Sequence, residues 1–161
     1  MRNVALLFLV LTACDFTGAV RTDAPADSAA GEVEFKLTGP NEAALVVPVS
    51  INGRAPVDFV LDTGATLTCI DVSLARVLNL SDEGPIGGVG IGAMTVGRIE
   101  TVRIDTLRLG HAVAYDLPAC RLDLAPLREA FGAQGLLGLN FLKEFDVALD
   151  FERRVLRLTR R

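Results

Sequence analysis

The amino-acid sequence predicts an all-β fold with one to three short helices. Val, Leu and Ile are abundant, glycine occurs 15 times in 161 residues, and few stretches show the period of a long helix. Half of the residues are hydrophobic, which is enough for a sizeable core. The length suits one folded domain, which we place at residues 32–161.

The first residues are expected to be a lipoprotein signal peptide. Arg2 precedes a short apolar run that suits a signal-peptide core and is too short to span a bilayer. The sequence Leu-Thr-Ala-Cys, which ends at Cys14, resembles the bacterial lipobox, in which the cysteine is lipidated. We therefore expect residues 1–13 to be removed and Cys14 to become the lipidated N-terminus. A plain secretory signal is the alternative.

The next residues are expected to tether the domain to a membrane. An Asp at position 15 resembles the signal that keeps lipoproteins at the inner membrane of diderm bacteria, which places the protein at the periplasmic face of that membrane. Residues 15–31 are rich in Ala, Asp, Ser, Thr and Pro and lack periodicity. Residues 14–31 are therefore interpreted as the lipidated cysteine and a flexible linker.

The folded part begins with strands. Val33, Phe35 and Leu37 alternate with charged residues, and residues 44–51 form a nearly continuous apolar run. Asn52-Gly53 follows this run and is a strong signal for a hairpin turn. The turn leads directly into the next strand.

That next strand carries the stretch around which the chain is organised. In this stretch, Val57, Phe59 and Leu61 alternate with Asp58, Val60 and Asp62, which is the two-residue period of a strand. Thr63-Gly64 then turns the chain, because glycine accepts backbone angles closed to other residues. Asp62 is therefore expected at a tight turn beside an apolar floor, where its pKa depends on its neighbours. Taken alone, Asp-Thr-Gly is also the sequence of an ordinary turn.

A strand, a short helix and a hairpin are expected after this turn. Residues 67–70 continue as a strand, and Asp71 or Ser73 can cap a helix. The apolar face of that helix is expected to consist of Leu74, Val77 and Leu78. Residues 84–97 hold six glycines and predict a mobile β-hairpin whose backbone can approach a ligand closely. The same stretch loosely matches the glycine motif of dinucleotide-binding proteins. That match is weak evidence, because no helix is expected to begin there.

The remaining chain predicts further strands and two short helices. Residues 99–109 and 112–124 read as strands around a turn at Gly110, and a helical turn over Pro126–Phe131 ends at Gly132. The last expected elements are a helix over 139–145, a strand over 147–151, a turn at 152–154 and a strand over 155–158.

Composition argues against several classes of function. The net charge is −4 and there is no basic stripe, so no nucleic-acid partner is expected. His111 is the single histidine and the cysteines are not clustered, so we expect neither a metal site nor a cofactor. A Ser-His-Asp apparatus would depend on His111, and no nucleophile motif accompanies it.

Three motifs in this order resemble those of the retropepsins, the single-domain aspartic proteases typified by retroviral proteases. Residues 61–65 (Leu-Asp-Thr-Gly-Ala) resemble the catalytic turn, and residues 86–90 (Ile-Gly-Gly-Val-Gly) resemble the glycine-rich flap. Residues 136–142 resemble the apolar-apolar-Gly motif and the helix after it. The resemblance covers about residues 44–151 and implies a small closed β-barrel with a flap.

The resemblance also implies roles for individual residues. These are Asp62 as catalytic residue, Thr63, Gly64 and Ala65 as support, Ile86, Gly87, Gly88, Val89, Gly90 and Ile91 as the substrate-binding flap, and Leu136, Leu137 and Gly138 as the apolar-apolar-Gly motif. The chain has no second Asp-Thr-Gly or Asp-Ser-Gly. An active enzyme is therefore expected to be a homodimer in which two Asp62 carboxylates activate a water and cleave a peptide or protein substrate.

The sequence departs from the retroviral pattern in two stretches. Residues 110–135 are longer than their retroviral counterpart, and residues 152–161 extend past the point where a retroviral protease ends. The dimer geometry is therefore left open. The alternative function is a catalytically silent peptide-binding or scaffold lipoprotein with the same fold.

Cys69 and Cys120 are the two cysteines outside the expected signal peptide and lipidation site. An oxidising compartment would allow a disulfide between them. We expect instead that both are free, small, buried apolar residues, and keep the disulfide as the alternative.

Overall fold

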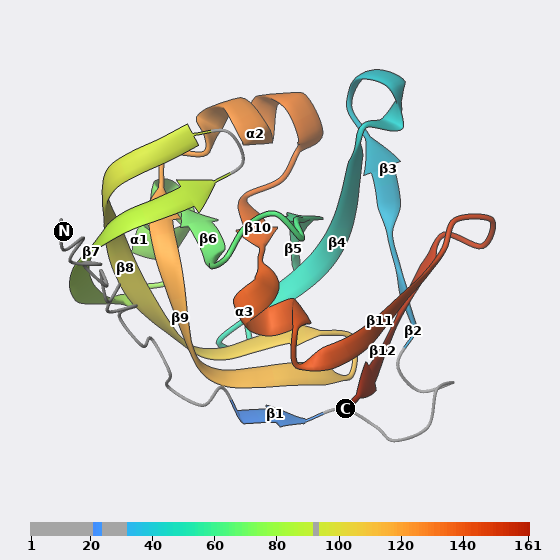
Figure 1. Ribbon diagram of the computed structural model, residues 1–161. Helices are drawn as coiled ribbons and strands as arrows, with labels where there is room; N and C mark the ends of the chain where they lie inside the picture. The colour runs from blue at the N-terminus through green and yellow to red at the C-terminus, as the bar shows by residue number, and fades with distance from the viewer. Residues whose placement is uncertain (1–20, 24–31, 92–93) are drawn as a thin grey trace, which may run out of the picture.

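The computed structural model describes residues 21–23, 32–91 and 94–161, and it confirms the all-β prediction. The main sheet closes into a barrel (Figure 1). Around the ring the order is β9, β6, β10, β5, β4 and β8, and β8 pairs with β9 to close it. These strands are β4 (Ala44–Ile51), β5 (Val57–Leu61), β6 (Thr68–Asp71), β8 (Met94–Leu109), β9 (Ala112–Leu122) and β10 (Gly135–Leu137). The predicted signal peptide and Cys14 lie outside the described residues.

The barrel encloses the main hydrophobic core. Phe59, Ile104 and Leu117 are among the fully buried side chains that fill it. Burying each such side chain contributes about 1.5–3 kcal/mol relative to leaving it in water. Phe141 and Phe145 extend the core, with ring centroids 5.1 Å apart. The abundance of aliphatic residues in the sequence is therefore used to fill one closed barrel.

The predicted turns and hairpin lie where the sequence places them. Asn52 and Gly53 both have positive φ, and β4 pairs antiparallel with β5 across this turn. The glycine-rich stretch forms a hairpin between β7 (Ser81–Ile91) and β8. Its second strand is longer than expected, because the hairpin strand and the strand predicted over 99–109 are one continuous strand. The mobility of this hairpin stays a prediction.

A small second sheet holds the C-terminal end of the chain. Its order is β11 (Phe145–Asp150), β12 (Val155–Arg160) and β2 (Glu32–Glu34). The alternating stretch over residues 33–37 forms two strands that divide at Phe35, and the second of them, β3 (Lys36–Thr38), pairs with β4 in the barrel. Glu32 accepts hydrogen bonds from Arg153 and Arg157, and these two contacts lower the pKa of Glu32 to about 2. The ion pairs therefore hold the start of the domain against its last strand.

The helices are short and sit between strands. They are the 3-10 helix η1 (Pro40–Glu42), α1 (Val72–Val77), α2 (Ala125–Phe131) and α3 (Leu139–Leu142). Asp71 caps α1, and Gly132 in a left-handed conformation ends α2, as predicted. Among the described residues, no helix is long and apolar enough to cross a membrane.

Two predictions about the helices are wrong in detail. Val77 does not belong to the buried face of α1: it is 73% exposed, and Ala75 is buried in its place. Helix α3 ends at Leu142 and not at Phe145, because Phe145 already pairs with Arg160 as the first residue of β11.

The predicted linker contains one ordered piece. Arg21–Asp23 forms β1, which pairs antiparallel with residues 113–115 of β9. The sequence did not predict this strand because pairing through the backbone requires no side-chain periodicity. The other residues expected to form the linker lie outside the described part of the chain.

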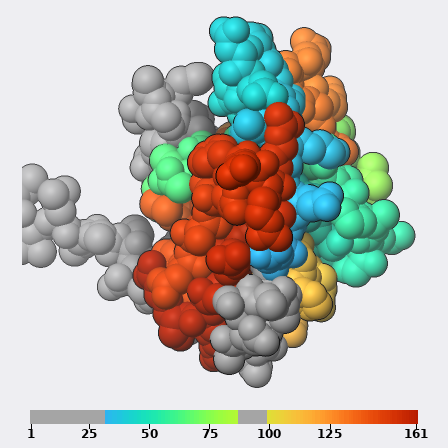
Figure 2. Space-filling model, turned by 90° about the vertical axis from the view of Figure 1, so that its right-hand side faces the viewer, coloured from blue at the N-terminus to red at the C-terminus, as the bar shows by residue number. Residues whose placement is uncertain are grey.

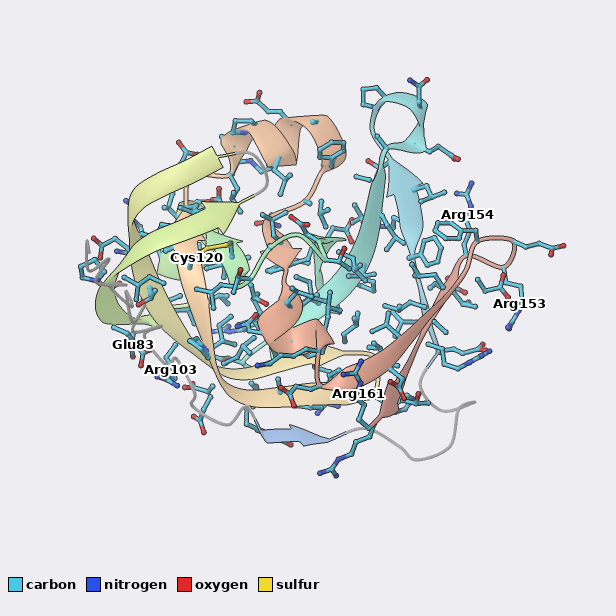
Figure 3. The ribbon with its side chains drawn as sticks, in the orientation of Figure 1. Glu83, Arg103, Cys120, Arg153, Arg154 and Arg161 are labelled. Carbon is cyan, nitrogen blue, oxygen red and sulfur yellow. A yellow bond between two sulfur atoms is a disulfide. The ribbon has the colours of Figure 1, made fainter. Side chains whose placement is uncertain are left out.

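Cys69 and Cys120 are joined by a disulfide, so the expectation of two free thiols is wrong. Strands β6 and β9 are parallel neighbours, and the two cysteines occupy paired positions with Cα atoms 4.4 Å apart. Figure 3 shows the bond at Cys120. The sequence could not indicate this pairing, because residues separated by 51 positions become neighbours only when the barrel closes.

Reducing this disulfide is expected to lower the free energy of unfolding by about 2–4 kcal/mol, because the bridge constrains the unfolded chain. The measurement is urea unfolding with and without a dithiol reductant, in a Cys14→Ser background that leaves this pair alone. Intact mass under denaturing conditions should rise by two hydrogen atoms on reduction. An unchanged mass would show that the thiols were free from the start.

Candidate active site

Asp62 directly follows strand β5, and hydrogen bonds fix its backbone and its carboxylate. Its backbone N–H donates to the carbonyl oxygen of Leu137 at 3.0 Å, which continues the ladder between β5 and β10. Its Oδ1 accepts from the backbone N–H of Gly64 at 2.8 Å, and its carbonyl oxygen accepts from Ala65 at 3.3 Å. The carboxylate is half-buried, with one oxygen held by a backbone donor.

The three residues after Asp62 differ in exposure. Thr63 and Gly64 are exposed, whereas Ala65 is fully buried. A Cβ on Gly64 would lie 3.2 Å from Oδ1 of Asp62, so glycine lets the backbone approach the carboxylate closely. The side chain of Thr63 makes no hydrogen bond with the described residues, and the residue is exposed at the same turn.

The apolar-apolar-Gly motif lies beside this turn, although about seventy residues separate them in sequence. Strand β10 inserts between β5 and β6, with Leu137 opposite Leu61 and Leu136 opposite both Val60 and Cys69. The chain then crosses the strand that leaves the turn. A Cβ on Gly138 would lie 2.5 Å from the carbonyl carbon and oxygen of Leu67, and only glycine fits this crossing.

Helix α3 completes the connection. The N–H of Leu139 donates to the carbonyl of Ala65 at 2.8 Å, and that of Asn140 donates to Thr66 at 3.1 Å. The structure therefore brings together two of the three motifs that the sequence identifies. Hydrogen bonds on both sides of Gly138 fix the conformation of the Asp62 turn.

The glycine-rich hairpin reaches this region through its first residue. The side chain of Ile86 packs against an apolar cluster that contains Leu136 and Cys69. For Gly87, Gly88, Val89, Gly90 and Ile91, the structure gives the backbone pairing with β8. The base of the hairpin thus lies over the strands that carry the motif residues.

Sequence reasoning missed the side chain that ties this site together. Asn140 is buried, and its Oδ1 accepts from both the N–H and the hydroxyl of Thr68, at 2.7 and 2.9 Å. Its Nδ2 donates to the carbonyl of Pro118 at 2.7 Å, and the Thr68 hydroxyl accepts from the N–H of Gly138. The sequence did contain a signal for this role. Asn140 is the one polar residue in the apolar stretch LLGLNFL, and a buried amide requires hydrogen-bond partners.

Asp71 is a second buried polar residue that the sequence indicated only as a helix cap. It is 1% exposed and accepts from Ser73, from the N–H of Leu124 at 3.0 Å and from Arg128 at 3.4 Å. Burial is the largest influence and raises the pKa of Asp71. The hydrogen bonds from Ser73 and Leu124 and the charge of Arg128 together outweigh it, so the pKa lies below its ordinary value. Asp71 therefore joins the starts of α1 and α2.

The Asp62 turn supplies one half-buried carboxylate, of which Oδ1 accepts a hydrogen bond from Gly64. The described residues contain no group of three His, Cys, Asp or Glu side chains placed to hold a metal ion. A single carboxylate can accept or donate one proton, and a second group is needed for a coupled acid and base.

Comparisons with known proteins agree with this arrangement. Residues 47–141, more than half of the chain, match the family model described as aspartyl protease. A solved retropepsin-like aspartic protease from Rickettsia conorii is similar with a TM-score of 0.55 and 16% sequence identity, over 86% of this chain and 93% of that one. At this identity the likeness is one of fold. No curated protein sequence matches significantly.

Two further solved structures match with lower TM-scores. The retroviral protease-like domain of Ddi1 from Leishmania major has a TM-score of 0.46 and 21% identity, over 73% of this chain and 94% of that one. EIAV protease in complex with the inhibitor HBY-793 has a TM-score of 0.41 and 21% identity, over 66% and 91%.

Gly138→Ala is expected to destabilise the fold by about 1–3 kcal/mol or more, because the added methyl group meets backbone atoms that cannot rotate away. Urea unfolding measures the change. Gly132→Asn is the matched control, since that glycine has open space around it and Asn tolerates its positive φ. Equal stability of Gly138→Ala and the parent would contradict the tight crossing.

Proposed function

Because the chain belongs to the aspartyl protease family and has a retropepsin-like fold, we propose that it is an aspartic endopeptidase that works as a homodimer. One observation carries this proposal. A half-buried Asp62 sits at a turn fixed by hydrogen bonds, and the sequence contains no second Asp-Thr-Gly or Asp-Ser-Gly. Two copies of the chain would supply the pair that the chemistry needs.

The proposed mechanism divides the work between the two Asp62 carboxylates. Two carboxylates in close contact share one proton, because ionising both is unfavourable. The ionised one takes a proton from a water held between them, and that water attacks the peptide carbonyl carbon. The protonated one donates its proton to the carbonyl oxygen as the tetrahedral intermediate forms. The first carboxylate then gives the proton it took from water to the leaving nitrogen, the C–N bond breaks, and a hydroxyl of the intermediate returns its proton to the second carboxylate as the product carboxyl group forms.

The residues around Asp62 fit supporting roles in this mechanism. The N–H of Gly64 holds Oδ1, which fixes the orientation of the carboxylate plane. The exposed hydroxyl of Thr63 is available to a second copy and would brace the dyad across the dimer. The glycine-rich hairpin would close over an extended peptide and bind its main chain by hydrogen bonds.

The C-terminal hairpin offers a surface for the second copy. Strand β11 lies at the end of its sheet, and its other edge has no partner among the described residues. Three apolar side chains on and after it are exposed, with Val147 at 40%, Leu149 at 38% and Phe151 at 58%. Figure 2 shows the C-terminal hairpin in the middle of one face of the molecule. Two antiparallel β11 edges can pair about a two-fold axis, as a symmetric dimer requires.

We also propose that Cys14 carries a lipid that anchors the protein at the periplasmic face of the inner membrane. The lipobox-like sequence supports this proposal. Anchored copies share a thin layer, so confinement would raise their effective concentration and favour the dimer. Metabolic labelling with a radiolabelled fatty acid, with Cys14→Ser as control, tests the anchor.

Asp62→Asn is expected to reduce peptide cleavage by orders of magnitude and leave the fold intact, because Asn has nearly the same shape and cannot act as a base. Cleavage of a diverse peptide mixture, followed by mass spectrometry, measures the activity, and thermal unfolding checks the fold. Equal cleavage by variant and parent would disprove the proposed site. Peptide binding without cleavage by the parent would favour the alternative, a catalytically silent peptide-binding or scaffold lipoprotein.

Specific activity of the soluble chain 15–161 is expected to fall on dilution, because the proposed site forms by association of two copies. A dilution series assayed on one peptide measures it.

Leu149→Lys places a charge on the β11 edge and should weaken association of the two copies. We expect this variant to sediment as a monomer and to lose at least tenfold in activity at a concentration where the parent is dimeric. Val77→Lys is the control, since it adds the same charge at an exposed valine on α1. Constant specific activity of a sample that sediments only as monomer would overturn the shared dyad.

A further inference from the structure

A row of apolar side chains crosses four neighbouring strands beside Asp62. Leu136 on β10 pairs with Val60 on β5 and with Cys69 on β6, and Cys69 pairs with Cys120 on β9. We call these four residues the apolar row. They belong to a second hydrophobic cluster, which is separate from the core inside the barrel.

The apolar row and Asp62 lie on the same face of the sheet. The residues next to the row along each strand, such as Phe59, Leu137 and Ile70, belong to the main core. Successive side chains of a strand point to opposite faces, so the row faces outward from the barrel. Asp62 follows Val60 by two positions and continues the same ladder, so it lies on the outward face with the row.

Two side chains from other elements cover this row. Ile86 comes from the base of the glycine-rich hairpin, and Leu127 comes from α2. Both are partly exposed, as are Val60 and Leu122. The cluster therefore offers apolar surface to a ligand that enters between the hairpin and the Asp62 turn.

Helix α2 is held at both of its ends, so Leu127 has a fixed position. At the start of the helix, Asp71 accepts from the N–H of Leu124, and it also accepts from Arg128 in the last turn of the helix. At its end, the carbonyl of Phe131 accepts from the Thr38 hydroxyl at 3.3 Å, and a Cβ on Gly39 would collide with the Phe131 ring. A wall fixed in this way can select a side chain by its size.

We propose that Leu127 is a specificity-determining residue: it limits the size of the substrate side chain that lies on Val60 and Leu136 next to the scissile bond. This rests on the proposed peptidase function. Leu127, Ile86 and Val60 all pack against the buried cluster that contains Leu136, so their side chains already occupy part of this apolar surface, and we expect the rest to suit an aliphatic side chain better than an aromatic ring. The enzyme should therefore prefer Val, Ile or Leu over Phe at that position.

The test compares paired peptides that differ only by Leu or Phe at the cleaved position, using the full-length protein purified in detergent. Leu127→Ala should raise the Phe-to-Leu ratio of kcat/KM about tenfold, and Leu127→Phe should lower it. Leu45→Ala is the matched control, since Leu45 is another partly buried leucine but packs against the main core. Thermal unfolding shows that each variant is folded, and changes in opposite directions exclude a general loss of structure.

A second measurement separates the two proposals. Matched peptides with a hydroxyethylene group in place of the scissile bond are titrated by calorimetry against the parent and the variants, and Leu127→Ala should shift the Phe-to-Leu ratio of affinities in the same direction. If the parent binds with this selectivity but cleaves nothing, the proposed function fails and the role of Leu127 stands. If it cleaves and Leu127→Ala changes neither ratio more than Leu45→Ala does, the role of Leu127 is overturned. If the parent neither cleaves nor binds, both are overturned.

Discussion

The crossing of two chain segments at Gly138 is the constraint on which the site depends. Strand β10 must lie between β5 and β6, and the chain leaving it must pass directly over the backbone of Leu67. With a side chain at this point, the hydrogen bonds on either side, from Asp62 to Leu137 and from Leu139 to Ala65, could not both form. The Asp62 turn therefore takes its shape from residues that are far away in sequence. Contacts between distant parts of a chain slow folding, because long loops must close before the contacts can form.

Strand β6 is held to the second half of the chain along its whole length. Asn140 connects Thr68 to Pro118 at one end, the disulfide joins Cys69 to Cys120 next to it, and Asp71 accepts from Leu124 at the other end. Each of these contacts has a different physical role. The hydrogen bonds of Asn140 satisfy a buried amide, those of Asp71 satisfy a buried carboxylate, and the disulfide constrains the unfolded chain. Their common effect is a rigid support beneath the turn. A rigid support suits the proposed mechanism, in which the carboxylate would have to match that of a second copy.

Local patterns in the sequence predicted local structure well. Asn52-Gly53 requires positive φ at both positions and so indicated its hairpin, and Gly132 indicated the end of α2 for the same physical reason. The motif residues around Asp62 and Gly138 were found through their resemblance to retropepsin motifs, and the structure gives the physical reason for their types: a tight turn at Gly64 and a close approach of two chain segments at Gly138. Features set by tertiary contacts were missed. The partner of Cys69, the role of Asn140 and the exposure of Val77 all depend on which elements become neighbours, and no period in the sequence encodes that.

Strand β11 illustrates the same limit and also connects the fold to the proposed assembly. The alternation of Val147, Leu149 and Phe151 predicted a strand, and the structure leaves all three side chains largely exposed, with Phe151 packed edge-on against Phe35. An exposed apolar strand edge favours association, and evolution commonly blunts such edges with charge or a covering element. Here the edge remains open among the described residues, in a chain for which we propose a catalytic pair shared between two copies. In the proposed homodimer, a second copy of the chain would pair with the open edge and also supply the second carboxylate. Its binding would bury the exposed apolar side chains and complete the catalytic site in one step.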